Sequence, residues 1–334
     1  MVNRSGLATA LLVMALVSLP QCYSTTDPGN LVPPTAEQDP RLPQITLKVA
    51  GRSRQVHLQT FGDRENPPLF LLHGSLSDFR ALLPFQALGD RYYVVMWDQR
   101  GNGLSERIGS EEYSFDSVVE EIDELRSRYA GGRPVSLIGH SFGAMYSALY
   151  MSRHPEHVDQ AVLVEPAGLN GEIFTDTFND VIDIDLFSPE LSETYWQNEV
   201  LAPSSHEAMD YKALLLLENG HQTHYFCDAD HPPRWPVWRP GAFVEYRRGK
   251  LMGAGLSGGS FDFDFAKGLD TFPRKVLLIG GTCSALGPDF QSRYHVPLFA
   301  DAEVDTIQGA GHRMFVEKPD DVLVAVRGYL REYQ

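Results

Sequence analysis

Ser141 stands in a sequence pattern that is typical of an activated serine nucleophile. An apolar run of strand length, residues 135–138, leads into Gly-His-Ser-Phe-Gly at residues 139–143, and a helix-like segment follows over residues 144–154. Such a turn between a strand and a helix holds the serine in a strained backbone with its hydroxyl exposed. The two glycines are required because a side chain at either position would collide with a neighbouring strand or helix. The pattern predicts that Ser141 is a catalytic nucleophile.

A serine hydroxyl needs a base to accept its proton and amides to stabilise the oxyanion. His312 is the candidate base, since it follows the small residues 309–311 in a loop between the last expected strand and the final helix. The amide of Phe142, at the start of the helix after the turn, can point at the oxyanion. The amide of Ser75, after an earlier apolar run, is the second candidate donor. We interpret His73, nearby, as a structural hydrogen-bonding residue.

The segments around these residues alternate between strand and helix. Continuous apolar runs are typical of strands buried on both faces of a parallel sheet. They occur at residues 68–72, 92–97, 135–138, 158–164 and 275–279, and a further short strand is expected at 304–307. Amphipathic patterns predict helices over residues 115–129, with Ser114 as N-cap, and over 319–333. Alternating apolar residues at 45–49 and 56–58, around Gly51, predict an antiparallel hairpin.

One long segment interrupts this alternation. Residues 167–271 are rich in aromatic residues, proline and histidine, with short helical pieces such as Met209 to Glu218. Alternation with one insertion predicts an α/β fold, a mostly parallel doubly wound sheet with an inserted, mainly helical cap. The core is expected at residues 44–166 and 272–334. Cap aromatic residues and acids are candidates for contact with a substrate: Tyr195, Trp196, Tyr211, Tyr225, Trp235, Trp238, Glu172, Asp176, Glu190, Glu193, Glu218 and Glu245.

From about Ile45 to its C-terminus the chain resembles the α/β-hydrolase superfamily. The branch concerned holds proline iminopeptidases, small esterases, haloalkane dehalogenases and C–C bond hydrolases. The resemblance rests, in chain order, on the His73-Gly74 loop, the loop from Asp98 to Ser105, the elbow at Ser141 and the loop that carries His312. It implies the α/β-hydrolase fold, an acyl-serine mechanism and no cofactor. It also implies that Asp98 and Arg100 are structural loop residues. Ser141 excludes the ester chemistry of dehalogenases and epoxide hydrolases, which requires a carboxylate at the elbow.

One departure from the family pattern concerns the acid that orients the histidine. The family usually places it after the strand at residues 275–279, in a pattern like Gly-x-x-Asp, but this chain has Ser284 where the aspartate should be. Glu165, after the preceding sheet strand, is the leading candidate acid. Asp289, five residues beyond Ser284, is the rival if the loop folds back, and the absence of any acid is the third alternative.

These residues predict a serine hydrolase that cleaves a small ester or amide through an acyl-serine intermediate. Ser141 would act as nucleophile, His312 as base and Glu165 as acid, with oxyanion donors at Phe142 and Ser75. An aminopeptidase similar to proline iminopeptidases, whose cap glutamates bind the free amine of a short peptide, is one alternative. A non-catalytic ligand-binding protein that retains the fold is another, and the serine at position 284 is its best support.

The N-terminus has the features of an export signal. Arg4 supplies a positive charge, and residues 7–17 form an apolar stretch too short to span a bilayer comfortably. We therefore expect a signal peptide over residues 1–22, export to the periplasm or the medium, and a flexible tether over residues 23–43. Cys22 is either a lipidated residue of a lipoprotein signal or is lost through ordinary cleavage near residue 24.

The composition limits the partners. The 334 residues carry a formal net charge of −16, which argues against binding to nucleic acid or to an anionic membrane surface. A lipid at Cys22 is thus the expected route to a membrane. Cys227 and Cys283 either form a disulfide or remain separate thiols. We interpret the histidines of 221–231 as loop residues and predict no metal site. The sequence does not indicate an oligomeric state.

Overall fold

The computed structural model describes residues 32–181, 205–218, 225–253 and 260–332. Its centre is one eight-stranded sheet. The strands are β1 (Gln44–Val49), β2 (Arg52–Phe61), β3 (Pro68–Leu72), β4 (Tyr93–Trp97), β5 (Val135–His140), β6 (Val158–Val164), β7 (Val276–Gly281) and β8 (Ala302–Ile307). Their order is β1-β2-β4-β3-β5-β6-β7-β8, with β2 antiparallel to β1 and β4 and every other pair parallel. The sheet is mostly parallel, as predicted.

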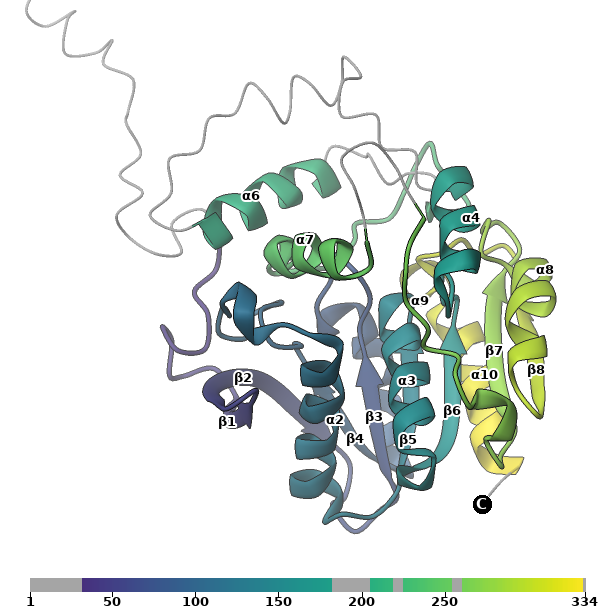
Figure 1. Ribbon diagram of the computed structural model, residues 1–334, viewed down its shortest axis with the longest axis horizontal. Helices are drawn as coiled ribbons and strands as arrows, with labels where there is room; N and C mark the ends of the chain where they lie inside the picture. The colour runs from purple at the N-terminus through teal and green to yellow at the C-terminus, as the bar shows by residue number, and fades with distance from the viewer. Residues whose placement is uncertain (1–31, 182–204, 219–224, 254–259, 333–334) are drawn as a thin grey trace, which may run out of the picture.

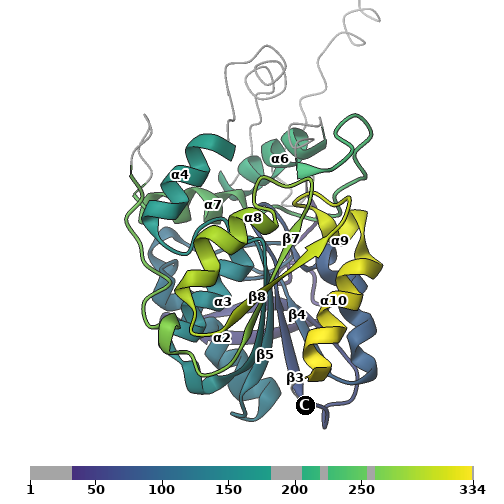
Figure 2. The same cartoon turned by 90° about the vertical axis from the view of Figure 1, so that its right-hand side faces the viewer.

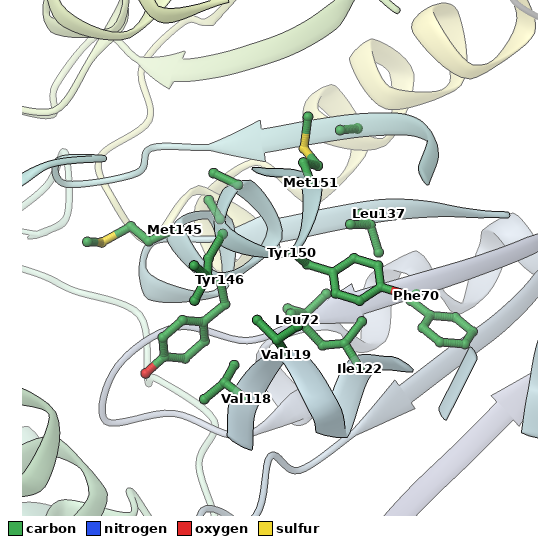
Figure 3. Close-up of a cluster of buried hydrophobic side chains, with 14 of the residues drawn as sticks. Phe70, Leu72, Val118, Val119, Ile122, Leu137, Met145, Tyr146, Tyr150 and Met151 are labelled. Atoms are coloured by element: carbon green, nitrogen blue, oxygen red, sulfur yellow. The ribbon is translucent and has the colours of Figure 1, made fainter. Parts of the chain in front are cut away.

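Helices cover both faces of this sheet. On one face lie α2 (Phe115–Ala130) and α3 (Phe142–Arg153); on the other lie the 3₁₀ segment η1 (Phe79–Asp90), α9 (Met314–Glu317) and α10 (Pro319–Glu332), as Figure 2 shows nearly edge-on. Alternate residues of β3 serve the two faces: Phe70 and Leu72 pack with α2 and α3, whereas Leu69 and Leu71 pack with η1 and α10. Figure 3 shows Phe70 and Leu72 among the buried side chains that pack with α2 and α3. Burial on both faces explains the continuous apolar runs.

The local signals in the sequence produce the expected elements. The turn between β1 and β2 passes through Ala50 and Gly51 with φ of 52° and 72°, which suits a tight hairpin. Helix α2 begins after Ser114, whose hydroxyl accepts a hydrogen bond from the Ser117 amide at 3.1 Å. It ends at Gly131, where φ is 59°. These elements confirm the predicted hairpin and helix.

The described part of the inserted segment contributes three helices above the carboxyl ends of the strands: α4 (Gly171–Val181), α6 (Ser205–Glu218) and α7 (Ala242–Leu251), seen at the top of Figure 1. The two ends of the insertion pack against the main core. Leu169, Phe265 and Leu269 are buried in the cluster that holds α2 and α3. The Phe265 amide donates to the Leu169 carbonyl at 2.8 Å. Apolar residues at both ends of the insertion thus complete the main core, as do Phe174 of α4 and Val244 of α7. The cap bounds of 167–271 stay a prediction.

Residues 32–43, predicted as part of a flexible tether, are instead packed against the body. The Ala36 amide donates to the Leu104 carbonyl at 2.7 Å, and Arg239 donates to the Pro33 carbonyl at 3.1 Å. Val32 and Ala36 are buried. Irregular turns fixed by backbone hydrogen bonds leave no periodic pattern, so this packing could not be predicted from the sequence. The rest of the tether and the expected signal peptide, with Cys22, lie outside the described residues.

Candidate active site

Ser141 lies at the turn between β5 and α3 in a backbone conformation that L-residues rarely adopt. Its φ and ψ are 54° and −119°. The surrounding structure fixes this conformation, since the Ser141 amide donates to the Val164 carbonyl at 2.9 Å and the Ser141 carbonyl accepts from Ala144 at 3.0 Å. Such strain persists only where neighbours determine it, and it is common at catalytic residues.

The two glycines of the turn have no room for a side chain. A Cβ atom at Gly139 would lie 2.4 Å from the Gly143 carbonyl oxygen, and one at Gly143 would lie 2.1 Å from the Leu72 carbonyl oxygen. Both distances are far below van der Waals contact. The steric reason given for the Gly-x-Ser-x-Gly pattern is therefore confirmed, and it explains how helix α3 can start directly against β3.

Glu165 follows the end of β6, and its backbone is also strained, with φ of 44°. Its side chain is fully buried. Oε2 lies 2.6 Å from His312 Nδ1. Oε1 accepts the Gly281 amide at 2.7 Å, and Oε2 also accepts the Ser284 hydroxyl at 2.8 Å. The structure thus brings Glu165 and His312, which are 147 residues apart, into direct contact.

The contact between Glu165 and His312 has a chemical consequence. A carboxylate at Nδ1 favours the tautomer with its proton on that nitrogen, so Nε2 carries the lone pair that a general base needs. Burial raises the pKa of Glu165 to about 7, and the hydrogen bonds from Gly281 and Ser284 oppose that shift. The ionisation of this carboxyl is therefore sensitive to pH near neutrality.

Asp289, the rival acid, does not occupy an equivalent place. It lies in the short helix α8 (Pro288–Phe290) with an exposed side chain. Among the described residues, Glu165 is the carboxylate in hydrogen-bond contact with the His312 ring. The geometry favours Glu165 over Asp289.

His140 was not singled out in the sequence, yet it joins the elbow to the His312 loop. Its Nε2 donates to the His312 carbonyl at 2.9 Å, and the two ring centroids are 4.7 Å apart. Burial, together with His312 and Arg313, holds the pKa of His140 well below its usual value, so the ring is neutral at pH 7. The sequence feature that could have drawn attention to His140 is its position inside the Gly-x-Ser-x-Gly pattern, directly before Ser141.

The candidate oxyanion donors flank Ser141. Phe142 is the first residue of α3, where helix amides have no intrahelical acceptor. Ser75 belongs to the loop after β3, and this loop approaches the elbow so closely that a Cβ at Gly74 would lie 3.0 Å from the Ser141 Cβ. Within the described residues, the Ser75 amide donates to no acceptor. Phe142 and Ser75 thus lie on the two segments that meet at the candidate nucleophile, and their role as oxyanion donors stays a prediction.

A scan against protein-family models matches residues 67–319 to the alpha/beta hydrolase fold. The chain belongs to the α/β-hydrolase family. This hydrolase is 26% identical over 302 residues to the proline iminopeptidase PfmaB of Pestalotiopsis fici, covering 83% of this chain and 96% of the relative. It is 24% identical over 291 residues to a proline iminopeptidase of Lactobacillus helveticus, covering 84% and 95%.

Solved structures agree on the fold of this hydrolase. The crystal structure of VinJ superposes with a TM-score of 0.63 at 19% identity, covering 87% of this chain and 99% of VinJ. The proline iminopeptidase of Mycobacterium smegmatis gives a TM-score of 0.60 at 17% identity, covering 87% and 98%. The predicted fold class and superfamily are therefore confirmed.

The structural roles expected for His73, Asp98 and Arg100 in the early loops agree with their contacts in this hydrolase. His73 is buried, and its Nε2 accepts the Gln99 amide at 3.1 Å. Asp98 accepts hydrogen bonds from the amides of Phe79 and Leu104, at 3.0 and 2.7 Å. Arg100 is buried against Glu121 at 3.0 Å. These contacts hold the loops together and support a structural role for each residue.

Cap helix α7 places Arg248 directly over the elbow. Its buried guanidinium lies 3.6 Å from the Phe142 ring centroid. It also donates to the Tyr146 hydroxyl at 3.0 Å, to the Ser75 hydroxyl and to the Glu245 carboxylate. Glu245 in turn accepts the Leu76 amide at 3.3 Å. The pair connects the cap to both segments that carry the candidate oxyanion donors.

A disulfide joins Cys227 to Cys283, which answers the question that the sequence left open. The bond attaches the part of the insertion that contains Tyr225 and Cys227 to the loop that carries Ser284. The Arg313 amide donates to the Tyr225 carbonyl at 3.1 Å, and the Tyr225 ring lies 5.4 Å from the His312 ring. The disulfide therefore helps to hold Tyr225 over the candidate base.

The histidine-rich loop offers little for a metal. His221 and His224 lie outside the described residues, and Cys227 is oxidised. His231 is exposed and pairs with Asp228 at 3.5 Å. In the described part of the chain, the group of His154, Glu156 and His157 could hold an ion, but it lies at the other end of α3 from Ser141. Nothing there connects a metal to the candidate site.

Proposed function

We propose that this hydrolase cleaves a small carboxylic ester or amide through an acyl-serine intermediate. The observation that carries the proposal is the 2.6 Å contact between Glu165 Oε2 and His312 Nδ1, together with the strained elbow at Ser141. It supports Glu165 as the acid, the role that the serine at position 284 had put in doubt. The same contact argues against a non-catalytic binding protein, which would have no use for a buried carboxylate that orients a histidine.

The mechanism follows from these positions. His312 Nε2 accepts the Ser141 proton as the hydroxyl oxygen attacks the substrate carbonyl carbon. The amides of Phe142 and Ser75 stabilise the oxyanion, and Glu165 stabilises the imidazolium. His312 then donates the proton to the leaving alcohol or amine, which leaves the acyl group on Ser141. A water, deprotonated by His312, attacks the acyl carbon and releases the carboxylic acid.

The nature of the substrate is the second part of the proposal. The proline iminopeptidase relatives favour an aminopeptidase as an alternative, and such an enzyme needs a cap carboxylate for the substrate ammonium. Glu245 reaches the site, but Arg248 and the Leu76 amide already engage it. Glu172 and Asp176 are exposed on α4. These three carboxylates therefore favour an uncharged acyl group; Glu190, Glu193 and the side chain of Glu218 lie outside the described residues.

An assay with matched substrates separates these alternatives. Protein that lacks residues 1–24 is tested on short-chain p-nitrophenyl esters and on prolyl and alanyl anilides, with Ser141→Ala as the control. We expect ester cleavage that disappears in the control. Anilide cleavage that also requires Ser141 would instead identify an aminopeptidase, and ligand binding without turnover of either substrate would identify a binding protein.

We further propose that the protein is exported. The N-terminal signal features support this, and the exposed Cys227–Cys283 disulfide is compatible with an oxidising compartment. No helix among the described residues is both long and apolar enough to cross a bilayer. Fractionation of expressing cells, followed by mass spectrometry of the mature N-terminus, tests export. A diacylglyceryl group on Cys22 would identify a lipid-anchored form, and an intact N-terminus in the cytosol would contradict export.

A further inference from the structure

The Ser284 side chain contacts Glu165, the candidate acid, at the same carboxylate oxygen that contacts His312. Its hydroxyl donates to Glu165 Oε2 at 2.8 Å, and the same oxygen lies 2.6 Å from His312 Nδ1. The other carboxylate oxygen is occupied by the Gly281 amide at 2.7 Å. Ser284 thus donates to the carboxylate oxygen that contacts His312, while the Gly281 amide donates to the other oxygen.

The direction of this hydrogen bond is fixed by the loop. The Leu286 amide donates to Ser284 Oγ at 3.1 Å. An amide can only donate, so it occupies a lone pair of the hydroxyl, and the hydroxyl proton points toward Glu165. The Ser284 amide donates to the Gly281 carbonyl at 3.1 Å, and the preceding Cys283 is held by the disulfide. The donor is therefore held in place before any substrate binds.

We propose that Ser284 is a positioning residue for the acid of the proposed triad. Its hydroxyl holds Glu165 Oε2 against His312 Nδ1 and stabilises the anionic carboxylate there. Ser284 touches neither the substrate nor Ser141 in this role and acts through Glu165. The inference rests on the proposed serine-hydrolase function and adds the reason why a serine, rather than an acid, suits the loop after β7.

The groups that face Glu165 determine what a pH profile reports. His312 is the titratable neighbour in direct contact. His140 contacts His312 from β5, and its pKa is held so low that it stays neutral. From β7 and the following loop come the uncharged donors Gly281 and Ser284. The Arg313 guanidinium lies over the Trp235 ring, 3.7 Å from its centroid. The acidic limb of kcat/KM therefore belongs to the coupled pair of Glu165 and His312.

The test compares Ser284→Ala with Ser284→Thr, which keeps a hydroxyl at the same place. The measurement is kcat/KM against pH on the p-nitrophenyl ester that the wild type cleaves best. Removal of a donor from the anionic carboxylate favours its protonation. We expect the acidic limb of Ser284→Ala to move up by about one pH unit, which is a loss of about tenfold on that limb and little loss at high pH. Ser284→Thr is expected to return the limb to its wild-type position.

The results that would contradict the role of Ser284 can be told apart from those that would contradict the proposed function. A loss in Ser284→Ala that is equal at all pH values, with the limb unmoved, would mean a merely structural role and would overturn the inference. The inference would also be overturned if Ser284→Thr did not return the acidic limb to its wild-type position although its melting temperature matched that of the wild type. Both leave the proposed function intact, because the wild type is active in those cases. A wild type that turns over no ester or anilide and does not react with a fluorophosphonate would overturn the proposed function and the inference together.

Discussion

Glu165 is a buried carboxyl whose hydrogen-bonding neighbours in the described structure are the Gly281 amide, the Ser284 hydroxyl and the His312 ring. All three can donate, so the anion is favoured by its partners and disfavoured by its burial. Burial prevails and raises the pKa to about 7. A carboxyl in this balance is ionised above neutral pH and protonated below it, and this sets the pH range in which it can orient His312.

The acid can be identified by separate substitutions. We expect Glu165→Ala to lower kcat by roughly 10³- to 10⁴-fold, because the imidazolium loses its counter-charge and the ring loses its tautomer. Asp289→Ala is the matched control, since Asp289 is exposed on α8 and should change kcat less than about twofold. Steady-state kinetics on one ester substrate gives both values. The reverse order of effects would show that the active conformation differs from the structure described.

The pH dependence follows from the coupled pair of Glu165 and His312, in which the raised pKa of Glu165 sets the expected midpoint. The pKa of Glu165 is raised, and the active form is the ionised one, so activity is lost as the pH falls through the folded-state value of about 7. We expect kcat/KM of the wild type to rise with pH to a plateau, with a midpoint near neutrality. Circular dichroism over the same range controls for unfolding. A plateau that extends unchanged to pH 5 would contradict this assignment.

At the scale of elements, the sheet and the elbow were readable from sequence because their signals are local. Strands buried on both faces are continuous apolar runs, and the Gly-x-Ser-x-Gly turn has steric requirements within a few residues. The choice between Glu165 and Asp289 was not local, since it depends on where the loop after β7 points. Helix α7 and η1 were also missed: α7 has few buried apolar residues, and a proline lies inside η1.

The tight packing of α3 against β3 makes a specific prediction. Gly143→Ala places a methyl group 2.1 Å from the Leu72 carbonyl oxygen, so the helix must shift. We expect a loss of about 3 kcal/mol in the free energy of unfolding, together with a displaced Ser141. Gly328→Ala in α10, where nothing lies within 4 Å, is the control and should stabilise the protein by about 0.5–1 kcal/mol. Urea titration measures both. Equal effects would contradict the packing described.

At the scale of the whole molecule, the disulfide and the Arg248–Glu245 pair connect the inserted segment to the loops of the candidate site. The sequence could supply the cysteines and the charged residues but not these connections, because they join segments far apart in the chain. The disulfide joins residues 56 apart. Glu245 and Arg248, neighbours on α7, contact Leu76 and Ser75 across 169 and 173 residues. The same is true of residues 32–43, which Arg239 contacts at the Pro33 carbonyl. The charge and composition limited the classes of partner that could be expected. Which side chains meet depends on packing between segments that are far apart in the chain.

The disulfide should contribute measurably to stability. It joins residues 56 apart, and a crosslink of that span stabilises by about 4 kcal/mol in the chain-entropy description. We expect a reductant to lower the melting temperature of the wild type. The variant with both Cys227→Ser and Cys283→Ser should melt at the lower temperature and be insensitive to the reductant. A wild type whose thiols react quantitatively before any reduction would contradict the bond.

The central claim is that Ser141 is a nucleophile activated by His312 and Glu165. The most direct measurement is the mass of the intact protein after treatment with a fluorophosphonate, followed by peptide mapping, in the wild type and in Ser141→Ala. We predict one adduct per chain on the peptide that contains Ser141, and none in the variant. A wild type that remains unmodified, or an adduct that persists on another residue in Ser141→Ala, would contradict the account.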